Sequence, residues 1–425
     1  MRYLYSALFY ALLPFVVLRM LLRSRRAPDY RRRLAERFGL FTAPADTVRS
    51  AIWVHAVSVG ETLAAAPVIE SLLQAYPDHR LVVTTTTPTG SERVQALFGD
   101  RVIHVYAPWD LPGAVRRFLH RTRPCLLLIM ETELWPNMLH YSRARGCRIV
   151  LANARLSERS ARGYARFGGL TRTMLEQLDI VACQSAIDGQ RFTSLGLPAA
   201  ALQVTGSIKF DLELDETMRM QAAGLRQDYA ADKRPILVAA STHAGEEEQI
   251  LAAFATVKRS VHNCLLIIVP RHPERFDAVH RLCVSGGWQV LRRSGGDTPG
   301  LSDDIVLGDT MGELLLLLSV ATLAVMGGSL VEHGGHNVLE AAAWGVPVVT
   351  GPHMFNFAAA SDLLVSAAAM IMLEDAQQLG ACLVELLGDP ERRLQMGAAA
   401  QQVMADNRGA KEKLLELVAE NLAGA

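Results

Sequence analysis

The sequence predicts an α/β protein of two doubly wound, parallel-sheet domains in tandem, preceded by an apolar N-terminal helix. The chain has 425 residues, which is more than one ordinary hydrophobic core covers. Short apolar runs alternate with helical stretches along the chain, as in parallel sheets covered on both faces. The halves also resemble each other, because residues 51–65 (AIWVHAVSVGETLAA) and 235–250 (PILVAASTHAGEEEQI) both follow the order strand, small polar loop, Gly-Glu, helix.

The N-terminal element is the apolar run 3–22, which is about as long as a helix that crosses a bilayer. Pro14 and Arg19 interrupt this run, and a basic flank follows it: Arg23, Arg25, Arg26, Arg31, Arg32 and Arg33. No small-residue cleavage site is evident, so we expect residues 1–25 to remain as a membrane anchor. The basic flank predicts that the rest of the chain lies in the cytoplasm. A helix lying flat in the membrane interface is the alternative.

The strands of both domains are expected at short apolar runs. They lie at 51–56, 81–86, 102–105, 125–130, 148–152, 180–183 and 202–205, and then at 236–240, 264–269, 288–291, 304–307, 322–326 and 346–349. The polar stretch 211–234 is the expected linker between an N-terminal domain, 26–210, and a C-terminal domain, 235–425. The last helix is a candidate to pack back on the N-terminal domain. A small-molecule site is expected in a cleft between the domains, on loops that follow the strands.

The two halves differ in charge, although the net charge of the whole chain is zero. Residues 1–205 contain 26 basic and 15 acidic residues, whereas residues 206–425 contain 17 and 28. All 26 basic residues of the first half are arginine, whose planar guanidinium suits phosphate and carboxylate. We therefore expect the first half to face an anionic partner. The apolar N-terminal run favours membrane phospholipid or a phosphorylated lipid over nucleic acid.

Several common site types are disfavoured. The chain contains neither GxGxxG nor GxxxxGK, the motifs of dinucleotide oxidoreductases and P-loop ATPases. Its six cysteines are widely spaced and form no CxxC pair, which argues against a zinc site or a disulfide framework. His333 and His336 have no further ligand cluster nearby in the sequence, so we expect no metal site.

Three charged residues of the expected N-terminal domain follow expected strands. Glu61 lies just before a helix expected to begin at Thr62, where nucleotide-binding turns hold a phosphate. A helix N-terminus favours an ionised carboxylate, so we expect Glu61 to stay deprotonated, with a purely helix-capping role as the alternative. Glu131 follows strand 125–130, and Lys209 follows strand 202–205. Such a lysine either pairs with a strand-end carboxylate or holds an anionic substrate.

The second half carries a glycine-rich loop, GGSLVEHGGHNVLE, at 327–340. Its glycines allow close backbone approach, and N–H groups at the start of the following helix can hold a phosphate. Glu340 is placed to accept hydrogen bonds from a ribose, whereas a capping box of Asn337 with Glu340 is the alternative. Arg271 after strand 264–269 and the segment 311–313 after strand 304–307 are expected to complete a nucleotide pocket.

Seven segments in order resemble the Kdo transferases, which build the inner core of lipopolysaccharide (Kdo is 3-deoxy-D-manno-octulosonic acid). They are HAVSVGE, ETELWPN, NARLSERS, GSIKFD, VPRHPERF, MGE and GGSLVEHGGHNVLE, and they extend through nearly the whole chain. The resemblance implies two facing Rossmann-like domains, the glycosyltransferase B fold, on the cytoplasmic face of the bacterial inner membrane. It implies inverting transfer of Kdo from CMP-Kdo to a tetraacylated, bisphosphorylated lipid A precursor (lipid IVA), and neither a cofactor nor a metal is expected.

The resemblance also assigns roles to individual residues. Glu61 is implied to be the general base, and Glu131 and Lys209 are implied to stabilise the transition state. The implied CMP contacts are Pro270, Arg271, Met311, Gly312, Glu313, Asn337, Val338, Leu339 and Glu340. Further candidates for substrate binding are Ser58, Gly60, Gly328 and Ser329. The alternatives are a glycosyltransferase B-type enzyme that uses a UDP-sugar and a lipid acceptor, a sugar-nucleotide epimerase, and a membrane-bound nucleotide-sugar sensor without catalytic activity.

Overall fold

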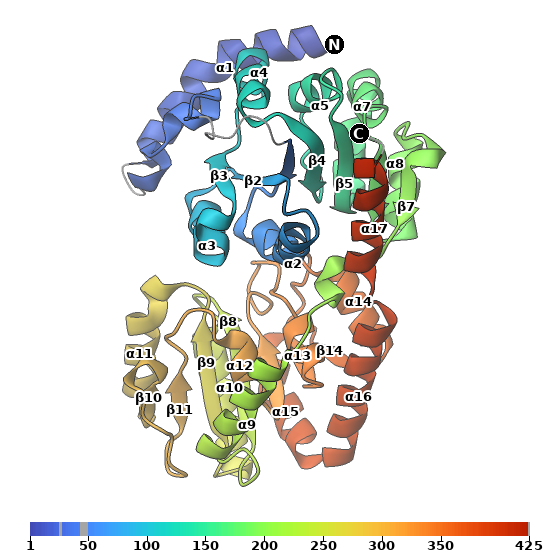
Figure 1. The fold of residues 1–425 in the computed structure, drawn as a ribbon. Helices are drawn as coiled ribbons and strands as arrows, with labels where there is room; N and C mark the ends of the chain where they lie inside the picture. The colour runs from blue at the N-terminus through green and yellow to red at the C-terminus, as the bar shows by residue number, and fades with distance from the viewer. Residues whose placement is uncertain (25–27, 43–49, 424–425) are drawn as a thin grey trace. The chain divides into compact units, whose positions relative to one another are not determined.

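The computed structural model describes residues 1–24, 28–42 and 50–423, and the chain forms two compact units (Figure 1). The first unit comprises Met1–Asp211 and Arg408–Ala425, and the second comprises Leu212–Asn407. Arg25 and Arg26 of the basic flank lie outside the described residues, as does the expected boundary between anchor and domain.

The first unit contains a seven-stranded parallel sheet in the order β3-β2-β1-β4-β5-β6-β7. Its strands are β1 (Ala51–His55), β2 (Arg80–Thr85), β3 (Ile103–Tyr106), β4 (Pro124–Met130), β5 (Arg148–Ala154), β6 (Ile180–Cys183) and β7 (Leu202–Val204). The central strands are apolar almost throughout, because helices cover both faces of the sheet. Strand β1 pairs with β2 on one side and with β4 on the other, so the strand order reverses between β1 and β4.

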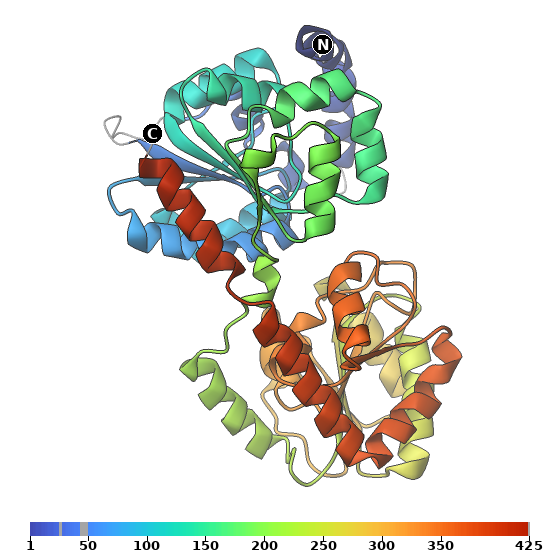
Figure 2. The ribbon, with the colours of Figure 1, turned by 90° about the vertical axis from the view of Figure 1, so that its right-hand side faces the viewer.

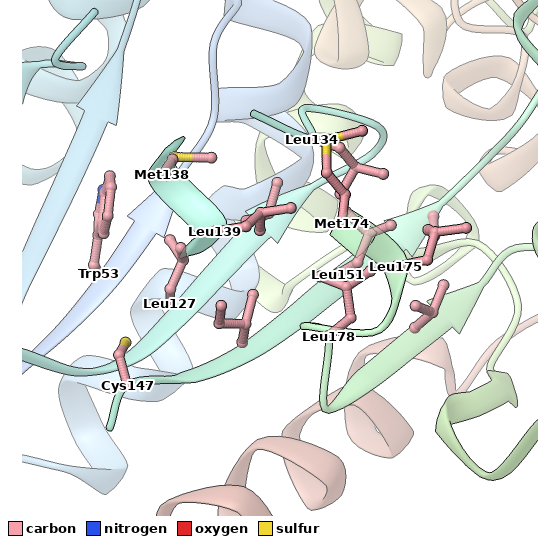
Figure 3. Close-up of a cluster of buried hydrophobic side chains, with 14 of the residues drawn as sticks. Trp53, Leu127, Leu134, Met138, Leu139, Cys147, Leu151, Met174, Leu175 and Leu178 are labelled. Atoms are coloured by element: carbon pink, nitrogen blue, oxygen red, sulfur yellow. The ribbon is translucent and has the colours of Figure 1, made fainter. Parts of the chain in front are cut away.

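Helices cover this sheet on both faces. The helices of this unit are α1 (Arg2–Arg23), which packs on α5, and α2 (Val59–Ala75), α3 (Pro88–Phe98), α4 (Pro112–Thr122), α5 (Pro136–Arg143), α6 (Glu158–Ala165), α7 (Gly168–Leu175), α8 (Ala186–Ser194) and α17 (Ala410–Ala423). One core joins side chains of β1, β4 and β5 to those of α5 and α7, including Trp53, Leu127, Leu139, Leu151 and Leu175 (Figure 3). The core on the other face joins the sheet to α2 and to α17, the red C-terminal helix in Figures 1 and 2.

The second unit contains another seven-stranded parallel sheet, in the order β10-β11-β9-β8-β12-β13-β14. Its strands are β8 (Ile236–Thr242), β9 (Leu265–Pro270), β10 (Val290–Arg292), β11 (Ile305–Leu307), β12 (Leu323–Met326), β13 (Val348–Thr350) and β14 (Met370–Met372). Its helices are α9 (Glu216–Asp228), α10 (Glu247–Ser260), α11 (Phe276–Ser285), α12 (Leu314–Leu318), α13 (Leu339–Ala343), α14 (Ala358–Ser366), α15 (Leu379–Gly388) and α16 (Pro390–Asp406). Here the strand order reverses between β8 and β12.

The predicted fold class is confirmed, since both sheets are parallel and doubly wound. Every expected strand is present, and its ends differ from the prediction by no more than two residues. The sequence analysis missed β14, a three-residue edge strand. Residues 211–234, expected as a linker, contain α9, which packs on α12 of the second unit. Among the described helices, α1 is long and apolar enough to cross a membrane by length and composition.

Candidate active site

The first candidate site lies at the carboxyl edge of the first sheet, where the strand order reverses. In open α/β sheets, ligands bind in the crevice at such a switch point. The first turn of the helix that follows β1 carries Glu61, and the loop after the neighbouring β4 carries Glu131. The topology therefore brings these two carboxylates, which three α-helices and three strands separate in the sequence, to one place in the fold.

Glu61 is held in the first turn of α2. The helix begins at Val59, three residues before the expected start, with Ser58 as its N-cap. The Oε2 atom of Glu61 accepts the backbone N–H of Val57 at 2.8 Å, and Oε1 accepts the Ser58 hydroxyl at 3.0 Å. Glu61 keeps 9% of its surface exposed, while Gly60 beside it is exposed. The side chain therefore takes part in the helix cap and has a fixed orientation.

The pKa of Glu61 differs from the sequence-based expectation. Burial, helped by the negative charges of Glu131 and Glu133, raises the pKa of Glu61 from 4.5 to about 7. Hydrogen bonds from Val57 and Ser58 lower this pKa, but burial outweighs them. The expectation that the helix terminus keeps Glu61 fully ionised was therefore wrong. A carboxylate with a pKa near neutrality is a stronger base than an ordinary glutamate.

Glu131 and Lys209 form an ion pair beside this site. The Nζ atom of Lys209 lies 3.1 Å from Oε1 of Glu131, and both side chains are partly buried. The backbone of Glu131 is left-handed, with φ 56°, a conformation that costs free energy for a residue with a side chain. Lys209 lies in a short 3₁₀ turn, η5 (Ile208–Phe210), whose Ile208 N–H donates to Oδ1 of Asn153 at 3.2 Å. The structure thus brings together the two residues that the sequence placed after separate strands.

The second candidate site lies at the corresponding edge of the second sheet, between β8 and β12. The glycine-rich loop after β12 is braced by Glu246, which is 0% exposed. The carboxylate of Glu246 accepts the backbone N–H groups of Gly328 at 2.7 Å, Ser329 at 3.1 Å and Leu330 at 2.9 Å. The Ser329 hydroxyl donates to the Met326 carbonyl. Three backbone amides at the start of the glycine-rich loop are therefore bonded to a carboxylate of the chain itself.

Histidines and one arginine gather beside this loop. The Nε2 atoms of His243 and His336 are 2.7 Å apart, and the rings of His243 and His333 are stacked with centroids 4.3 Å apart. Burial, together with the neighbouring histidines and the charge of Arg271, lowers the pKa of His243 to about 4 and that of His336 to about 3. No group of His, Cys, Asp and Glu side chains in the described part of the chain is arranged to hold a metal ion. These contacts place neutral imidazoles next to a guanidinium.

The residues predicted to bind CMP fall into two groups. The charge of Arg271 acts on the half-buried Glu340 carboxyl and lowers its pKa, which burial raises, and Oε1 of Glu340 accepts a hydrogen bond from Nδ2 of Asn337 at 3.1 Å. Pro270 ends β9 next to Arg271, and Val338 and Leu339 are buried at the start of α13. By contrast, Met311 is 62% exposed, and Glu313, after Gly312, is bonded to Arg293 at 3.1 Å and to Thr310. The structure joins the segments around 271 and 340 and gives Glu313 other partners.

The sequence analysis missed His243 and Glu246 as site residues. Both lie in the segment 235–250, which was used only as evidence of a repeated fold. The repeat itself contains the signal, because Gly245-Glu246 aligns with Gly60-Glu61. Because Glu61 was identified as a site residue, this alignment would have identified Glu246 as a candidate site residue too.

Comparison with known proteins identifies the family. Residues 32–212 match the family described as 3-Deoxy-D-manno-octulosonic-acid transferase (kdotransferase). The chain is similar to the 3-deoxy-D-manno-octulosonic acid transferases of Haemophilus influenzae (42% identity) and Bordetella pertussis (38% identity), with 98% of each chain covered in both comparisons. In fold it resembles a glycosyltransferase from Rickettsia africae, with a TM-score of 0.58 and 12% identity over 89% of this chain and 100% of that one. The chain therefore belongs to the 3-deoxy-D-manno-octulosonic acid transferase family of glycosyltransferases.

Proposed function

We propose that this enzyme transfers Kdo from CMP-Kdo to a bisphosphorylated lipid A precursor, with inversion at the anomeric carbon. Membership of the transferase family supports the transfer of Kdo, and the two switch-point sites supply the groups that such a transfer needs. The first unit provides the base and the second unit provides the nucleotide pocket. The arginine-rich first half, with 26 basic residues in 1–205, suits an acceptor that carries phosphates.

Glu61 acts as the general base in this proposal. Its carboxylate takes the proton of the acceptor hydroxyl while that oxygen forms a bond to the anomeric carbon of Kdo. The bond from this carbon to the CMP phosphate oxygen breaks on the opposite face, so the configuration inverts. A pKa of about 7 leaves a large fraction of Glu61 ionised near neutral pH and still basic enough to accept the proton. This raised pKa, at a carboxylate fixed by Val57 and Ser58, is the single observation that carries the assignment.

Glu131 and Lys209 stabilise the transition state in this proposal. The ammonium of Lys209 favours negative charge that develops during the displacement, and Glu131 holds the ammonium in place at 3.1 Å. The left-handed backbone of Glu131 is consistent with such a role, since strained conformations cluster at functional sites.

The nucleotide is bound by the second unit. We assign the CMP phosphate to Arg271 and the neighbouring imidazole N–H groups of His243 and His336, which can offset the charge of the leaving phosphate without a metal or cofactor. Asn337 and Glu340 hold the nucleoside, because an amide and a carboxyl side chain can bond ribose and base hydroxyl or amino groups. The backbone amides of Gly328 and Ser329 donate to the Glu246 carboxylate, and these bonds hold the glycine-rich loop in the shape that the pocket needs.

Mass spectrometry of the products formed from CMP-Kdo and a lipid A precursor tests the proposal. We expect the acceptor mass to increase by one or more Kdo residues and CMP to be released. Competition by CMP but not by UDP excludes a UDP-sugar transferase, and the absence of turnover without an acceptor excludes an epimerase. Failure to modify the acceptor, with intact CMP-Kdo recovered, would overturn the proposal.

A further part of the proposal concerns location. An acceptor with acyl chains is embedded in a membrane, and the exposed apolar side chains of α1 suit attachment to the same membrane. We place the enzyme on the cytoplasmic face of the inner membrane, in contact with phospholipid. Cell fractionation tests this location, because recovery in the soluble fraction would contradict it.

A further inference from the structure

Helix α1 has a protein-facing stripe and an outward face along its whole length. The stripe recurs at helical spacing and consists of residues 2, 5, 6, 9, 13, 16, 17, 20 and 24, all buried or half-buried. The outward face contains large apolar side chains that are 48–71% exposed: Leu4, Leu8, Leu12, Phe15, Leu18 and Leu22. The stripe is apolar from Phe9 to Met20, with Arg2, Ser6 and Ser24 at its ends, and the outward face is also mainly apolar, whereas a helix on a soluble protein presents polar residues outward.

The first turn of α1 is bonded into the first unit. Arg2 donates to Oδ1 of Asn137 at 3.0 Å, and Nδ2 of Asn137 donates to the buried Ser6 hydroxyl at 3.0 Å. Tyr5 is hydrogen-bonded to Asp110. The same Asp110 carboxylate accepts the backbone N–H groups of Asn137 and Met138, so it also caps α5. This buried polar network fixes the N-terminal end of α1 on α5.

The chain just after α1 is bonded to the same unit. Ser24, which ends the helix, is 1% exposed. The following 3₁₀ turn, η2 (Leu34–Phe38), places Arg37 so that it donates to the Thr86 carbonyl at 2.8 Å. In the same turn, Glu36 accepts the Tyr106 backbone N–H at 2.8 Å. The first turn of α1 is therefore bonded to α5, its C-cap Ser24 is buried, and η2 further along the chain is bonded beside β2 and β3 of the same unit (Figure 1).

The contacts of α1 with the first unit restrict the orientation that this helix can take in a membrane. A helix of 22 residues is about 33 Å long, close to the ~30 Å hydrocarbon thickness of a bilayer. A spanning helix of that length would hold its ends on opposite sides of the bilayer. Such a helix would break the bonds of Arg2 and Ser6 to Asn137 and would leave the buried Asp110 network without its partner from α1.

A basic pocket lies beside α1. It has a volume of about 400 Å³ and is lined by Gly113, Arg116, Arg117, His120, Arg121 and Arg145. Tyr10 of α1 adjoins it, since its hydroxyl lies 3.7 Å from where a Cβ atom at Gly113 would stand. Arg117 and Arg121 are oriented by bonds from Nε to the Phe38 and Phe41 carbonyls at 2.9 and 3.0 Å. Within the described residues, no carboxylate lies at ion-pair distance from the four arginines of this pocket.

We propose that α1 lies in the plane of one membrane leaflet, with its outward face among the acyl chains, and that the basic pocket beside it binds phospholipid phosphates. The apolar face supplies hydrophobic attachment, and the unpaired arginines supply attraction to anionic headgroups. The inference rests on the membrane attachment proposed above and is independent of the chemistry at Glu61. Of the two alternatives for the N-terminal run, a helix that crosses the membrane and a helix that lies flat in its interface, the inference favours the second.

A disulfide between Ser6→Cys and Asn137→Cys tests the in-plane arrangement in the full-length enzyme. The Ser6 hydroxyl accepts the Asn137 side-chain amide at 3.0 Å, so cysteines at these positions would face each other. We expect oxidation of isolated membranes to form the link and the linked protein to stay membrane-bound. Linked peptides are detected by mass spectrometry, and each single cysteine variant is the control. A link that forms in detergent but not in membranes would show a spanning helix and overturn the proposal.

Vesicle binding tests the two contacts separately. Leu4→Asp/Leu8→Asp/Phe15→Asp should weaken binding to vesicles of phosphatidylcholine and phosphatidylglycerol by roughly 100-fold or more. The control Met220→Asp/Leu301→Asp/Leu394→Asp changes equally exposed residues of the second unit and should bind like wild type. Equal weakening of both variants would contradict the assignment of the outward face.

The triple variant Arg116→Gln/Arg117→Gln/Arg121→Gln tests whether the basic pocket binds phospholipid phosphates. Binding to phosphatidylglycerol-containing vesicles should fall by about 10- to 100-fold, with little change on pure phosphatidylcholine. The control Arg219→Gln/Arg259→Gln/Arg281→Gln alters exposed arginines of the second unit. Wild-type binding by the pocket variant, once its melting temperature is shown to be unchanged, would exclude the pocket as a phosphate site.

The proposed function and this inference can fail separately. A lack of Kdo transfer to any acceptor would refute the proposed function, whereas the vesicle-binding and disulfide results would still decide whether α1 lies in the plane of the membrane.

Discussion

Glu61 and Glu246 occupy equivalent positions in the two units, each after a glycine at the start of the helix that follows the strand beside the switch point. Glu246 is fully buried, and its carboxylate is bonded to three backbone amides of the glycine-rich loop. Glu61 accepts one backbone amide and one hydroxyl and retains some exposure. The same structural position therefore supports a loop in one unit and presents a base in the other.

Removal of the Glu246 carboxylate should disrupt the glycine-rich loop. In Glu246→Ala, the amides of Gly328, Ser329 and Leu330 lose their acceptor inside the protein, which we expect to cost about 3–5 kcal/mol of unfolding free energy. Chemical denaturation measures this loss. Glu248→Ala, an exposed neighbour in the first turn of α10, should change stability by roughly 0.5 kcal/mol or less. Equal effects of the two substitutions would refute the bracing role.

Two nearby arginines should give different phenotypes. Arg271→Ala should raise the KM for CMP-Kdo by about 10- to 100-fold and change stability little, because a charge-assisted contact to phosphate is lost. Arg275→Ala should destabilise the protein by about 3–5 kcal/mol, because Glu247, whose side chain is 0% exposed, loses its partner at 2.9 Å. Steady-state kinetics and denaturation separate the two effects. An unchanged KM in Arg271→Ala would remove this residue from the nucleotide site.

Two substitutions at Glu131, whose backbone is left-handed, should have similar effects on kcat but different effects on stability. Glu131→Gly and Glu131→Ala both remove the carboxylate that holds Lys209, so both should lower kcat to a similar extent. Glycine adopts φ 56° without steric cost, so Glu131→Gly should be more stable than Glu131→Ala by about 1 kcal/mol. Thermal unfolding and turnover are measured on the same samples. Full activity in either variant would contradict the assigned role.

Stability at Glu61 should depend on pH in a definite direction. The pKa of this carboxyl rises from 4.5 to about 7 on folding, so its contribution to stability is full below pH 4.5 and is lost as the pH rises to about 7. At pH 8 the ionised side chain costs up to roughly 2–3 kcal/mol, and Glu61→Gln removes this cost. We expect Glu61→Gln to raise the melting temperature at pH 8 and to lose this advantage towards pH 5. A lower melting temperature at both values would indicate that Glu61 acts only as a helix cap.

Much of the fold was predictable because apolar strands and polar loops alternate clearly in this chain. Strand β14 was missed for a physical reason. It is three residues long and follows the alanine-rich run 366–369, which continues the composition of α14, and the break between them is the positive φ of Ala368. A sequence pattern does not reveal such a break in an alanine.

The candidate site was predictable only in part. Glu131 and Lys209 were found because charged residues after apolar strands meet at one sheet edge. The pKa of Glu61 was not, since it depends on the burial of this side chain and on Glu131 and Glu133 nearby, which are properties of the folded protein. The bonds from the glycine-rich loop to Glu246 were equally hidden, because they connect residues more than 80 positions apart.

The pH dependence of kcat in wild type and Glu61→Gln, with CMP affinity measured on the same proteins, tests the central claim most directly. Wild-type kcat should rise with pH through about 7 as Glu61 ionises. Glu61→Gln should lower kcat by about 10²- to 10⁴-fold, abolish this rise and leave the dissociation constant for CMP unchanged. A Glu61→Gln enzyme that keeps wild-type kcat and its pH profile would show that Glu61 is not the base.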